Sequence, residues 1–287
     1  MKIPVFTVDA FTNLPFKGNP AAVCPLLCKL QDELYQKIAA EMNLSETAFI
    51  TRLNPADDFS SGARFHLRWF SPTNEVPLCG HATLASAAVL FYKKKNINST
   101  LVFETMSGEL HVRQKGDSIV MDFPLNKPVP QVADDFKEVI KAAVGDHPVQ
   151  EVCLCPTTKK LMVRLDDTCD RSVLTSLQPN AAALLASESS GRVKGVIVTM
   201  LGAPQCQPGY DFYSRNFSPW NGIPEDPVTG SSHTVLASYW SEKLGKKMML
   251  AYQCSSRGGE LQLEVRDDGR LDITGQAVTI LEGTLFL

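Results

Sequence analysis

The residues with the clearest chemical potential form two short blocks that resemble each other. The first block begins at Arg68 and reads RWFSP, a short loop, and then PLCGHATLAS. The second begins at Arg215 and reads RNFSP, a longer loop, and then PVTGSSHTVLAS. Both blocks share the frame R-x-F-S-P, P-x-x-G and L-A-S. Each block therefore predicts a strand end, a glycine turn and the start of a helix.

The two predicted helix starts are candidate binding groups for an anion. Free amide groups at a helix start bind anions, and glycine lets a ligand approach the backbone closely. One start carries Cys79 and His81, whereas the other carries Asp226, Ser231 and Ser232. Different polar groups at equivalent positions favour different roles at one site. We expect the two starts to face each other in a cleft and hold one small carboxylate; two ordinary helix starts facing solvent are the alternative.

Glu46 is the candidate for proton transfer. Four apolar residues at i, i+4 spacing predict an amphipathic helix over residues 30–42, and Asn43 is a plausible C-terminal cap. The chain then enters a predicted strand over residues 47–51. Glu46 thus lies where a helix gives way to a strand, a place from which a side chain can point into a cleft. Taken by itself this position favours an ordinary surface glutamate, and a catalytic role depends on the surrounding motif.

An internal duplication organises the whole chain. Gly108-Glu109-Leu110 is echoed by Gly259-Glu260-Leu261, each at the start of an alternating strand. Residues 124–130 hold three prolines and read as a connection between the copies. We therefore predict a first repeat over residues 1–125 and a second over residues 126–287. The last strand, residues 277–287, could instead return to complete the first repeat, and the sequence leaves this open.

Composition excludes several classes of protein. The formal charge is −3, with 28 basic and 31 acidic side chains interspersed, so no basic stripe exists for nucleic acid. No apolar run is long enough to cross a membrane, and the N-terminus reads as a strand rather than a signal peptide. The eight cysteines are too sparse for a disulfide scaffold and offer no metal-ligand spacing. We expect a cytoplasmic protein with reduced thiols that binds neither nucleic acid nor membrane.

Five motifs resemble the phenazine-biosynthesis (PhzF-like) isomerase family over nearly the whole chain. They are VDAFT at residue 8, PFKGNP at 15, NLSET at 43, PLCGHATLA at 77 and EDPVTGS at 225. The resemblance implies an α+β fold of the diaminopimelate-epimerase type. In that fold two pseudo-symmetric domains each wrap a mostly antiparallel sheet around a central helix. It also implies an active site between the domains, and a homodimer is possible.

The resemblance also implies roles for individual residues. Glu46, His81 and Asp226 match the family's catalytic residues, and no cofactor or metal is expected. His81 would donate a hydrogen bond, although it could merely cap its helix. Asp226 would hold a substrate amine or hydroxyl, although an Asp-Pro pair could merely shape a turn. The predicted substrate-binding residues are Gly18, Asn19, Ser45, Gly80, Ala82, Gly230, Ser231 and Ser232.

The leading hypothesis is a cofactor-independent isomerase in which Glu46 moves a proton within a small carboxylate or amino-acid-like substrate. Partial exclusion of water would make this carboxylate a better base. Related racemases use two thiols, but here Cys79 is matched by Thr229, whose hydroxyl is too weak an acid, so two-thiol racemisation is not expected. The alternative is a protein-binding module with weak or vestigial catalysis. Resemblance to vertebrate family members suggests a WD-repeat protein as its partner.

Overall fold

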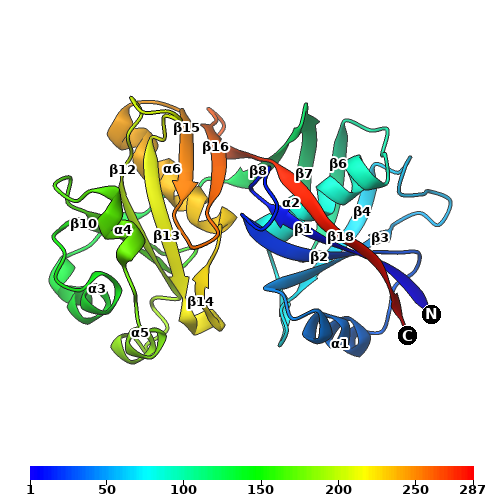
Figure 1. The fold of residues 1–287 in the computed structure, drawn as a ribbon, viewed down its shortest axis with the longest axis horizontal. Coiled ribbons are helices and arrows are strands. Elements are labelled where there is room, and N and C mark those ends of the chain that lie inside the picture. The colour runs from blue at the N-terminus through cyan, green and yellow to red at the C-terminus, as the bar shows by residue number, and fades with distance from the viewer. The chain divides into compact units, whose positions relative to one another are not determined.

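The computed structural model describes residues 1–287, which form two compact units (Figure 1). Unit 1 contains Met1–Phe123 and Asp272–Leu287, and unit 2 contains Pro124–Leu271. The C-terminal strand β18 (Ala277–Phe286) pairs antiparallel with β1 (Lys2–Ala10) along its whole length. The last strand therefore completes unit 1, which is one of the two alternatives that the sequence left open. Assigning residues 272–287 to the second repeat does not match this pairing.

Unit 1 is a mixed, mostly antiparallel sheet with two helical crossovers. The helix α1 (Asp32–Met42) connects the parallel strands β2 and β3, and the helix α2 (Gly80–Ala88) connects the parallel strands β4 and β6. Parallel neighbours need such crossovers, whereas antiparallel ones can be joined by tight turns. The remaining pairs are antiparallel. The strands that follow β1 are β2 (Asn19–Leu26), β3 (Glu46–Arg52), β4 (Arg64–Phe70), β5 (Glu75–Val76), β6 (Thr100–Thr105), β7 (Gly108–Lys115) and β8 (Ser118–Pro124).

Unit 2 repeats this order of elements. The helices α4 (Arg171–Ser176) and α5 (Ala181–Ser187) connect the parallel strands β11 and β12, and α6 (Gly230–Leu244) connects the parallel strands β13 and β15. A further helix, α3 (Lys137–Val144), precedes them. The strands are β9 (Val129–Pro130), β10 (Val149–Cys155), β11 (Lys160–Leu165), β12 (Gly195–Leu201), β13 (Phe212–Ser218), β14 (Ile223–Asp226), β15 (Met248–Gln253) and β16 (Gly259–Val265). The next strand, β17 (Arg270–Gly275), begins in unit 2 and continues into unit 1.

Strand register confirms that the two units are copies of one fold. Thr47 pairs with Phe70 in unit 1, and Val196 pairs with Phe217 in unit 2. Phe70 and Phe217 are the matching phenylalanines of the R-x-F-S-P motifs. The predicted α+β class, with a mostly antiparallel sheet around a central helix in each half, is therefore confirmed.

The central helix of each unit is buried on all sides over most of its length. Every residue of α2 from His81 to Ala88 is buried, and α6 is buried continuously from Ser232 to Trp240. A helix stretch that is buried all round must be enclosed by other elements. Figure 1 shows α2 and α6 lying behind the strands of their own units, with α1, α3, α4 and α5 outside the sheets. None of these helices is long and apolar enough to span a membrane.

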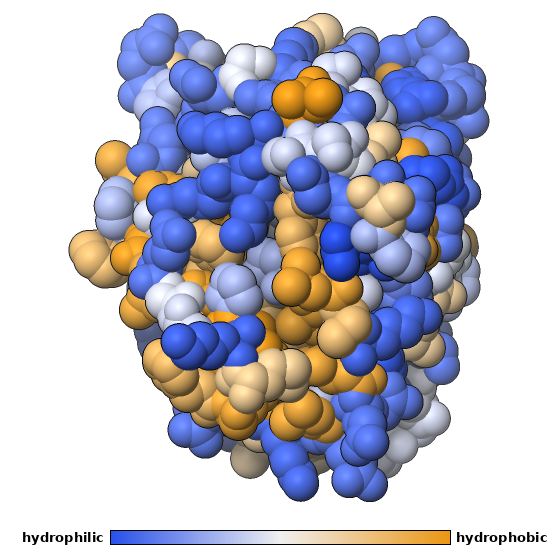
Figure 2. All heavy atoms as spheres, turned by 90° about the vertical axis from the view of Figure 1, so that its right-hand side faces the viewer, coloured by the Kyte–Doolittle hydropathy of each residue, from blue (hydrophilic) through white to orange (hydrophobic).

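The outer face of unit 1 near the chain ends carries exposed apolar side chains. Figure 2 views unit 1 from the side on which the termini lie and shows apolar areas between hydrophilic ones. Met1, Leu281 and Phe286 are 56%, 51% and 74% exposed. β18 contributes two of these side chains. The homodimer expected from the family resemblance stays a prediction, and this face is the first place to look for its interface.

The duplicated arginines each form a two-pronged ion pair. Arg68 donates through Nε and Nη2 to Glu75 at 2.7 and 2.8 Å, and Arg215 donates to Glu225 at the same two distances. Arg215 also donates to the carbonyl oxygens of Leu174 and Leu177 at 3.0 and 2.7 Å. The Arg215 side chain is 7% exposed, whereas that of Arg68 is 19% exposed. The same motif therefore carries more buried hydrogen bonds in unit 2.

We expect Arg215→Met to lower the free energy of unfolding by about 3–5 kcal/mol, because it leaves a half-buried glutamate and two backbone carbonyls without their donor. Arg68→Met removes a more exposed pair and should cost about 1–2 kcal/mol. Urea denaturation followed by circular dichroism measures both changes. Equal losses for the two variants would contradict the argument from burial.

Candidate functional site

The topology of unit 1 brings the ends of three strands to the start of α2. β2 and β3 run parallel and both begin at this edge, with Ala21 paired to Glu46. β4 runs antiparallel to β3 and ends here, with Phe70 paired to Thr47. The chain then passes through β5 into α2. Residues at the starts of β2, β3 and α2 are therefore neighbours, although they are far apart in sequence.

The loop before β2 is fixed by close packing. Gly18 has a φ of +64°, and a Cβ at this position would lie 2.1 Å from the carbonyl oxygen of Ala10. No other residue fits there without moving the backbone. The buried carboxylate of Asp9 accepts a hydrogen bond from the backbone N–H of Phe16 at 2.7 Å. These constraints set the position of Asn19, the first residue of β2, which is fully buried.

Four predicted site residues meet in one buried cluster. The Nε2 atom of His81 lies 3.2 Å from Oε2 of Glu46 and 3.2 Å from Oγ of Ser45. The Nδ1 atom of the same ring lies 3.2 Å from Nδ2 of Asn19. The Ser45 hydroxyl lies 3.4 Å from Oδ1 of Asn19 and 3.3 Å from the carbonyl oxygen of Pro20. His81 therefore connects the starts of β2, β3 and α2 through its two ring nitrogens.

The partners of His81 define its hydrogen-bonding roles. The amide Nδ2 of Asn19 is a donor, so Nδ1 of His81 acts as the acceptor. The ring proton that Nδ1 lacks then lies on Nε2, which donates to the Ser45 hydroxyl and lies 3.2 Å from Oε2 of Glu46. Cys79 Sγ lies 3.4 Å from Nδ1 of the same ring. Cys79 therefore neighbours the site.

Several predictions about unit 1 can now be decided. Glu46 is 7% exposed, so its reading as a surface glutamate is wrong. His81 makes no capping hydrogen bond, since the N-cap of α2 is Cys79 and no side chain caps this helix. Cys79 is buried, as predicted for a neighbour of the site. Gly80 and Ala82 lie in the first turn of α2, and their role in binding substrate stays a prediction.

A metal ion has a poor set of ligands here. Donor atoms of Glu46, Cys79 and His81 lie within 4.8 Å of one another. However, Cys79 lies on the Nδ1 side of the imidazole, whereas Glu46 lies on the Nε2 side. One ion bound to either nitrogen would be directed away from the ligand on the other side. The observed ring orientation therefore suits proton transfer better than metal binding.

The start of α6 in unit 2 is held by a network of its own. Thr229, its N-cap, donates through Oγ1 to Oδ2 of Asp226 at 2.6 Å. Gln253 accepts from the backbone N–H of Thr229 at 2.9 Å and donates to the carbonyl oxygen of Asp226 at 2.7 Å. Asp226 thus shapes the turn before the helix, which was one of its two predicted roles. Its role in binding substrate stays a prediction.

The other predicted residues of unit 2 differ in exposure. Gly230 begins α6 and is buried, while Ser231 is exposed. Ser232 is 1% exposed and donates to Oδ1 of Asn216 at 2.9 Å.

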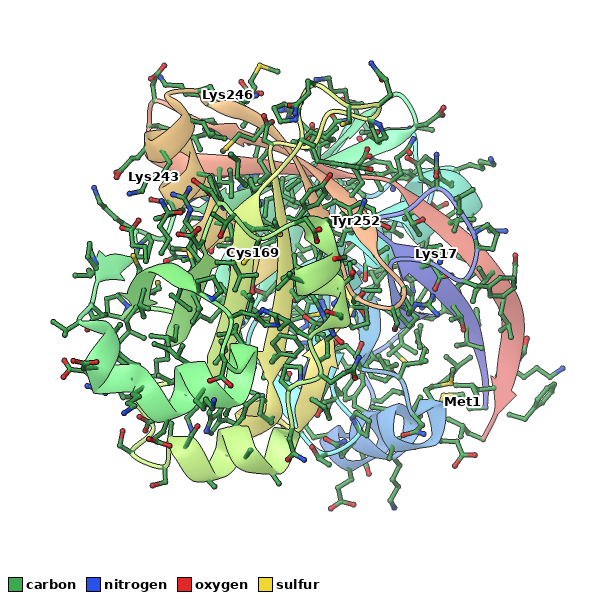
Figure 3. The ribbon with its side chains drawn as sticks, turned by 60° about the vertical axis from the view of Figure 1, so that its left-hand side comes forward. Met1, Lys17, Cys169, Lys243, Lys246 and Tyr252 are labelled. Carbon is green, nitrogen blue, oxygen red and sulfur yellow. The ribbon has the colours of Figure 1, made fainter.

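Two basic residues lie at the other end of this helix, Lys243 in the last turn and Lys246 just beyond it, as Figure 3 shows. Their charges complement the helix dipole, whose positive end lies at Gly230.

The structure describes each unit by itself. Glu46, His81, Asn19, Ser45, Gly18, Gly80 and Ala82 belong to unit 1, and Asp226, Gly230, Ser231 and Ser232 belong to unit 2. The predicted placement of one substrate between the two helix starts therefore stays a prediction.

Sequence reasoning missed three polar residues of unit 2. Lys160, Asn216 and His233 are all buried near the start of α6. Lys160 directly precedes the apolar run Leu161–Val163, which is typical of a buried parallel strand. A charged residue next to such an apolar run was the one feature of the sequence that could have marked Lys160 as a buried polar residue.

His233 supports the helix start from inside unit 2. Its Nδ1 atom lies 2.8 Å from the carbonyl oxygen of Thr229, and its ring stacks on Phe212 at 6.1 Å between centroids. The side chain is completely buried, and burial lowers the pKa of His233 to about 4. The folded protein therefore holds this ring neutral at pH values where the unfolded chain binds a proton.

We expect the stability of unit 2 to fall as the pH drops from about 6.5 to about 4, because only the unfolded chain binds a proton in this window. The loss should approach about 3 kcal/mol and should be absent above pH 7. His233→Asn keeps a side-chain donor without titrating and should remove most of this dependence. Thermal unfolding across the window measures it, and the exposed His147→Asn is the control. An unchanged pH profile in His233→Asn would refute the assignment.

Comparisons with known proteins are consistent across sequence and structure. A family model described as "Phenazine biosynthesis-like protein" matches residues 8–283. A phenazine biosynthesis-like domain-containing protein of Bos taurus is 60% identical over 99% of both chains. A protein of Pseudomonas aeruginosa named as an uncharacterized isomerase is 42% identical over all of both chains.

Solved structures agree with these relatives. A phenazine biosynthesis protein of the PhzF family from Enterococcus faecalis has 38% identity and a TM-score of 0.86, with all of both chains covered. A hydroxyproline epimerase from Agrobacterium vitis has 9% identity and a TM-score of 0.59 over 99% of this chain and 92% of its own. At that identity the epimerase shows only that the fold is shared.

Proposed function

We propose that this chain, which belongs to the phenazine biosynthesis-like (PhzC-PhzF) protein family, is a cofactor-independent isomerase acting on a small carboxylate or amino-acid-like substrate. The family resemblance seen in the five sequence motifs is confirmed by these matches. Two bacterial relatives, at 42% and 40% identity over their full lengths, are named as isomerases, which supports this class of reaction. The names of these relatives specify no substrate.

One observation carries the proposal: the carboxylate of Glu46 is buried against the imidazole of His81 at the start of α2. A carboxylate with little access to water is a stronger base than one in bulk solvent, because water no longer stabilises its charge. In the proposed reaction Glu46 removes a proton from an acidic carbon of the substrate. The same carboxyl group then returns the proton to another carbon of the substrate.

His81 would hold the carboxylate of Glu46 in a working orientation. Its Nε2 atom lies 3.2 Å from Oε2, while Asn19 fixes the ring from the Nδ1 side. Ser45 ties Asn19 and His81 together, so the ring has few alternative orientations. Such positioning keeps the reacting groups aligned, which contributes to the rate without forming any new bond.

In the same proposal, Asp226 holds an amine or hydroxyl of the substrate, and the amides at the helix starts hold its carboxylate. The hydrogen bond from Thr229 orients the Asp226 carboxylate. The positive end of α6 favours an anion near Gly230. These contributions extend the proposal, which depends first on Glu46.

Glu46→Gln should reduce proton transfer by about 10²–10⁴-fold, because an amide cannot act as the base. The measurement is deuterium incorporation in D2O, followed by mass spectrometry, for a panel of amino acids and small cyclic carboxylates. Glu41→Gln on the exposed side of α1 is the matched control and should retain the wild-type rate. Near wild-type exchange in Glu46→Gln would show that this residue is not the base.

Cys79→Ser should retain most of the activity, since the thiol neighbours His81 without carrying the transferred proton. The same exchange assay measures this variant. Loss of activity comparable with that of Glu46→Gln would favour the thiol-dependent reading that the sequence disfavoured. The match of Thr229 to Cys79 in the other repeat is the reason for expecting retention.

The protein-binding alternative, with a WD-repeat partner, stays a prediction from the family resemblance. A module without catalysis has no need to bury Glu46 beside His81, and burying such groups costs stability. If no compound exchanges protons with the wild type, and partner binding survives Glu46→Gln, this alternative replaces the isomerase.

A further inference from the structure

Lys160 is a buried cation with too few acceptors. It begins β11 and is 8% exposed. Its Nζ donates to Oδ1 of Asn216 at 3.2 Å, its one hydrogen bond, and that oxygen also accepts from the Ser232 hydroxyl at 2.9 Å. An ammonium group carries three N–H donors, and buried donors are normally satisfied. A shared amide oxygen is therefore an incomplete set of partners for this charge.

The local packing makes room for the ammonium group. Gly195 pairs with Lys160 across the parallel strands β11 and β12. A Cβ on Gly195 would lie 3.4 Å from Nζ of Lys160 and 2.8 Å from Oγ of Ser218. Any larger side chain at residue 195 would thus press on the lysine head group and on Ser218. The glycine thus leaves the place beside the start of β12 to the head group of Lys160.

The duplication identifies the residue of unit 1 that corresponds to Gly195. Glu46 precedes Thr47, which pairs with Phe70, and Gly195 precedes Val196, which pairs with Phe217. Gly195 is therefore the counterpart of Glu46 in the second copy. Unit 2 has no side chain at that place, and the head group of neighbouring Lys160 lies beside it instead. One copy places a carboxylate at its helix start, and the other places an ammonium group there.

The charges around Lys160 come from two other strands. Asp226 on β14 attracts the ammonium group, and Asn216 is paired with Asp226 in the strand register. Cys155 on β10 is the other titratable group that faces it. Burial, which outweighs these attractions, lowers the pKa of Lys160 to about 8. The amine is therefore mostly protonated at neutral pH and loses its charge in mildly alkaline solution.

We propose that Lys160, held by Asn216 beside the first turn of α6, forms a binding site in unit 2 for the carboxylate of a small organic anion. The ammonium group donates its remaining N–H bonds to the carboxylate oxygens. Ser232 lies in the first turn of α6, so the positive end of the helix dipole adds to the attraction. This site rests on the proposed function and deepens it, because it names the residues that recognise the substrate's carboxylate.

The test compares propionate with propionamide, which has nearly the same shape but no charge. Ligand-observed NMR titration at pH 6.5 should show binding of propionate, with at least tenfold weaker binding of propionamide. Lys160→Met should weaken propionate binding at least tenfold, whereas Lys160→Arg keeps the charge and should retain part of it. Equal propionate binding by wild type and Lys160→Met would overturn the proposal, as would failure of the wild type to prefer propionate.

The pH dependence of the wild type provides a test that needs no variant to fold. Propionate affinity should fall as the pH rises through about 8, because the ammonium group is lost. Affinity that stays constant from pH 6.5 to 9.5 would exclude Lys160 as the donor. Propionate binding and the deuterium exchange of Glu46→Gln are separate measurements on separate groups. The two proposals can therefore fail separately.

Discussion

The site in each unit depends on one packing constraint, which is that a helix buried on all sides must be enclosed by its own sheet. α2 is buried from His81 to Ala88 and α6 from Ser232 to Trp240. Enclosure places the first turn of the helix next to the starting residues of two parallel strands. The free amides of that turn and the side chains at the strand starts then share one small region. The chemistry of the protein follows from what occupies this region.

The two copies place side chains of opposite charge near the start of their central helices. Unit 1 places Glu46 against His81, and unit 2 places Lys160 against Asn216 and Ser232. The supporting structure has changed less, since Arg68 and Arg215 form ion pairs of the same geometry with Glu75 and Glu225. The ion pairs that stabilise the fold are thus similar in both copies, whereas the residues that face the helix start differ. Different residues therefore serve the stability of the fold and its chemistry.

Burying polar groups of this kind destabilises the folded protein unless they form hydrogen bonds with one another. In unit 1, His81 satisfies this requirement by using both ring nitrogens, with Asn19 and Ser45 on strand starts as fixed partners. In unit 2, Thr229, Gln253 and His233 fix the helix start through backbone and side-chain hydrogen bonds. Lys160 differs from these groups, because it is a buried cation whose single hydrogen-bond acceptor is shared with Ser232. A buried charge with so few acceptors is what directs attention to a ligand.

The sequence by itself determined the duplication and the residues of the helix starts, because these leave local and repeated patterns, and its family resemblance implied the α+β class. The helix over residues 30–42 was predicted almost to its observed bounds, since its apolar spacing and Asn43 cap are local signals. It also supplied Glu46, His81 and Asn19 as site residues through motifs. Only the tertiary structure decided that these three side chains touch, and that Glu46 is buried. It alone revealed Lys160 and the pairing of β18 with β1. Strand pairing and burial arise from contacts between distant segments, and such contacts leave no periodic trace in the residues that make them.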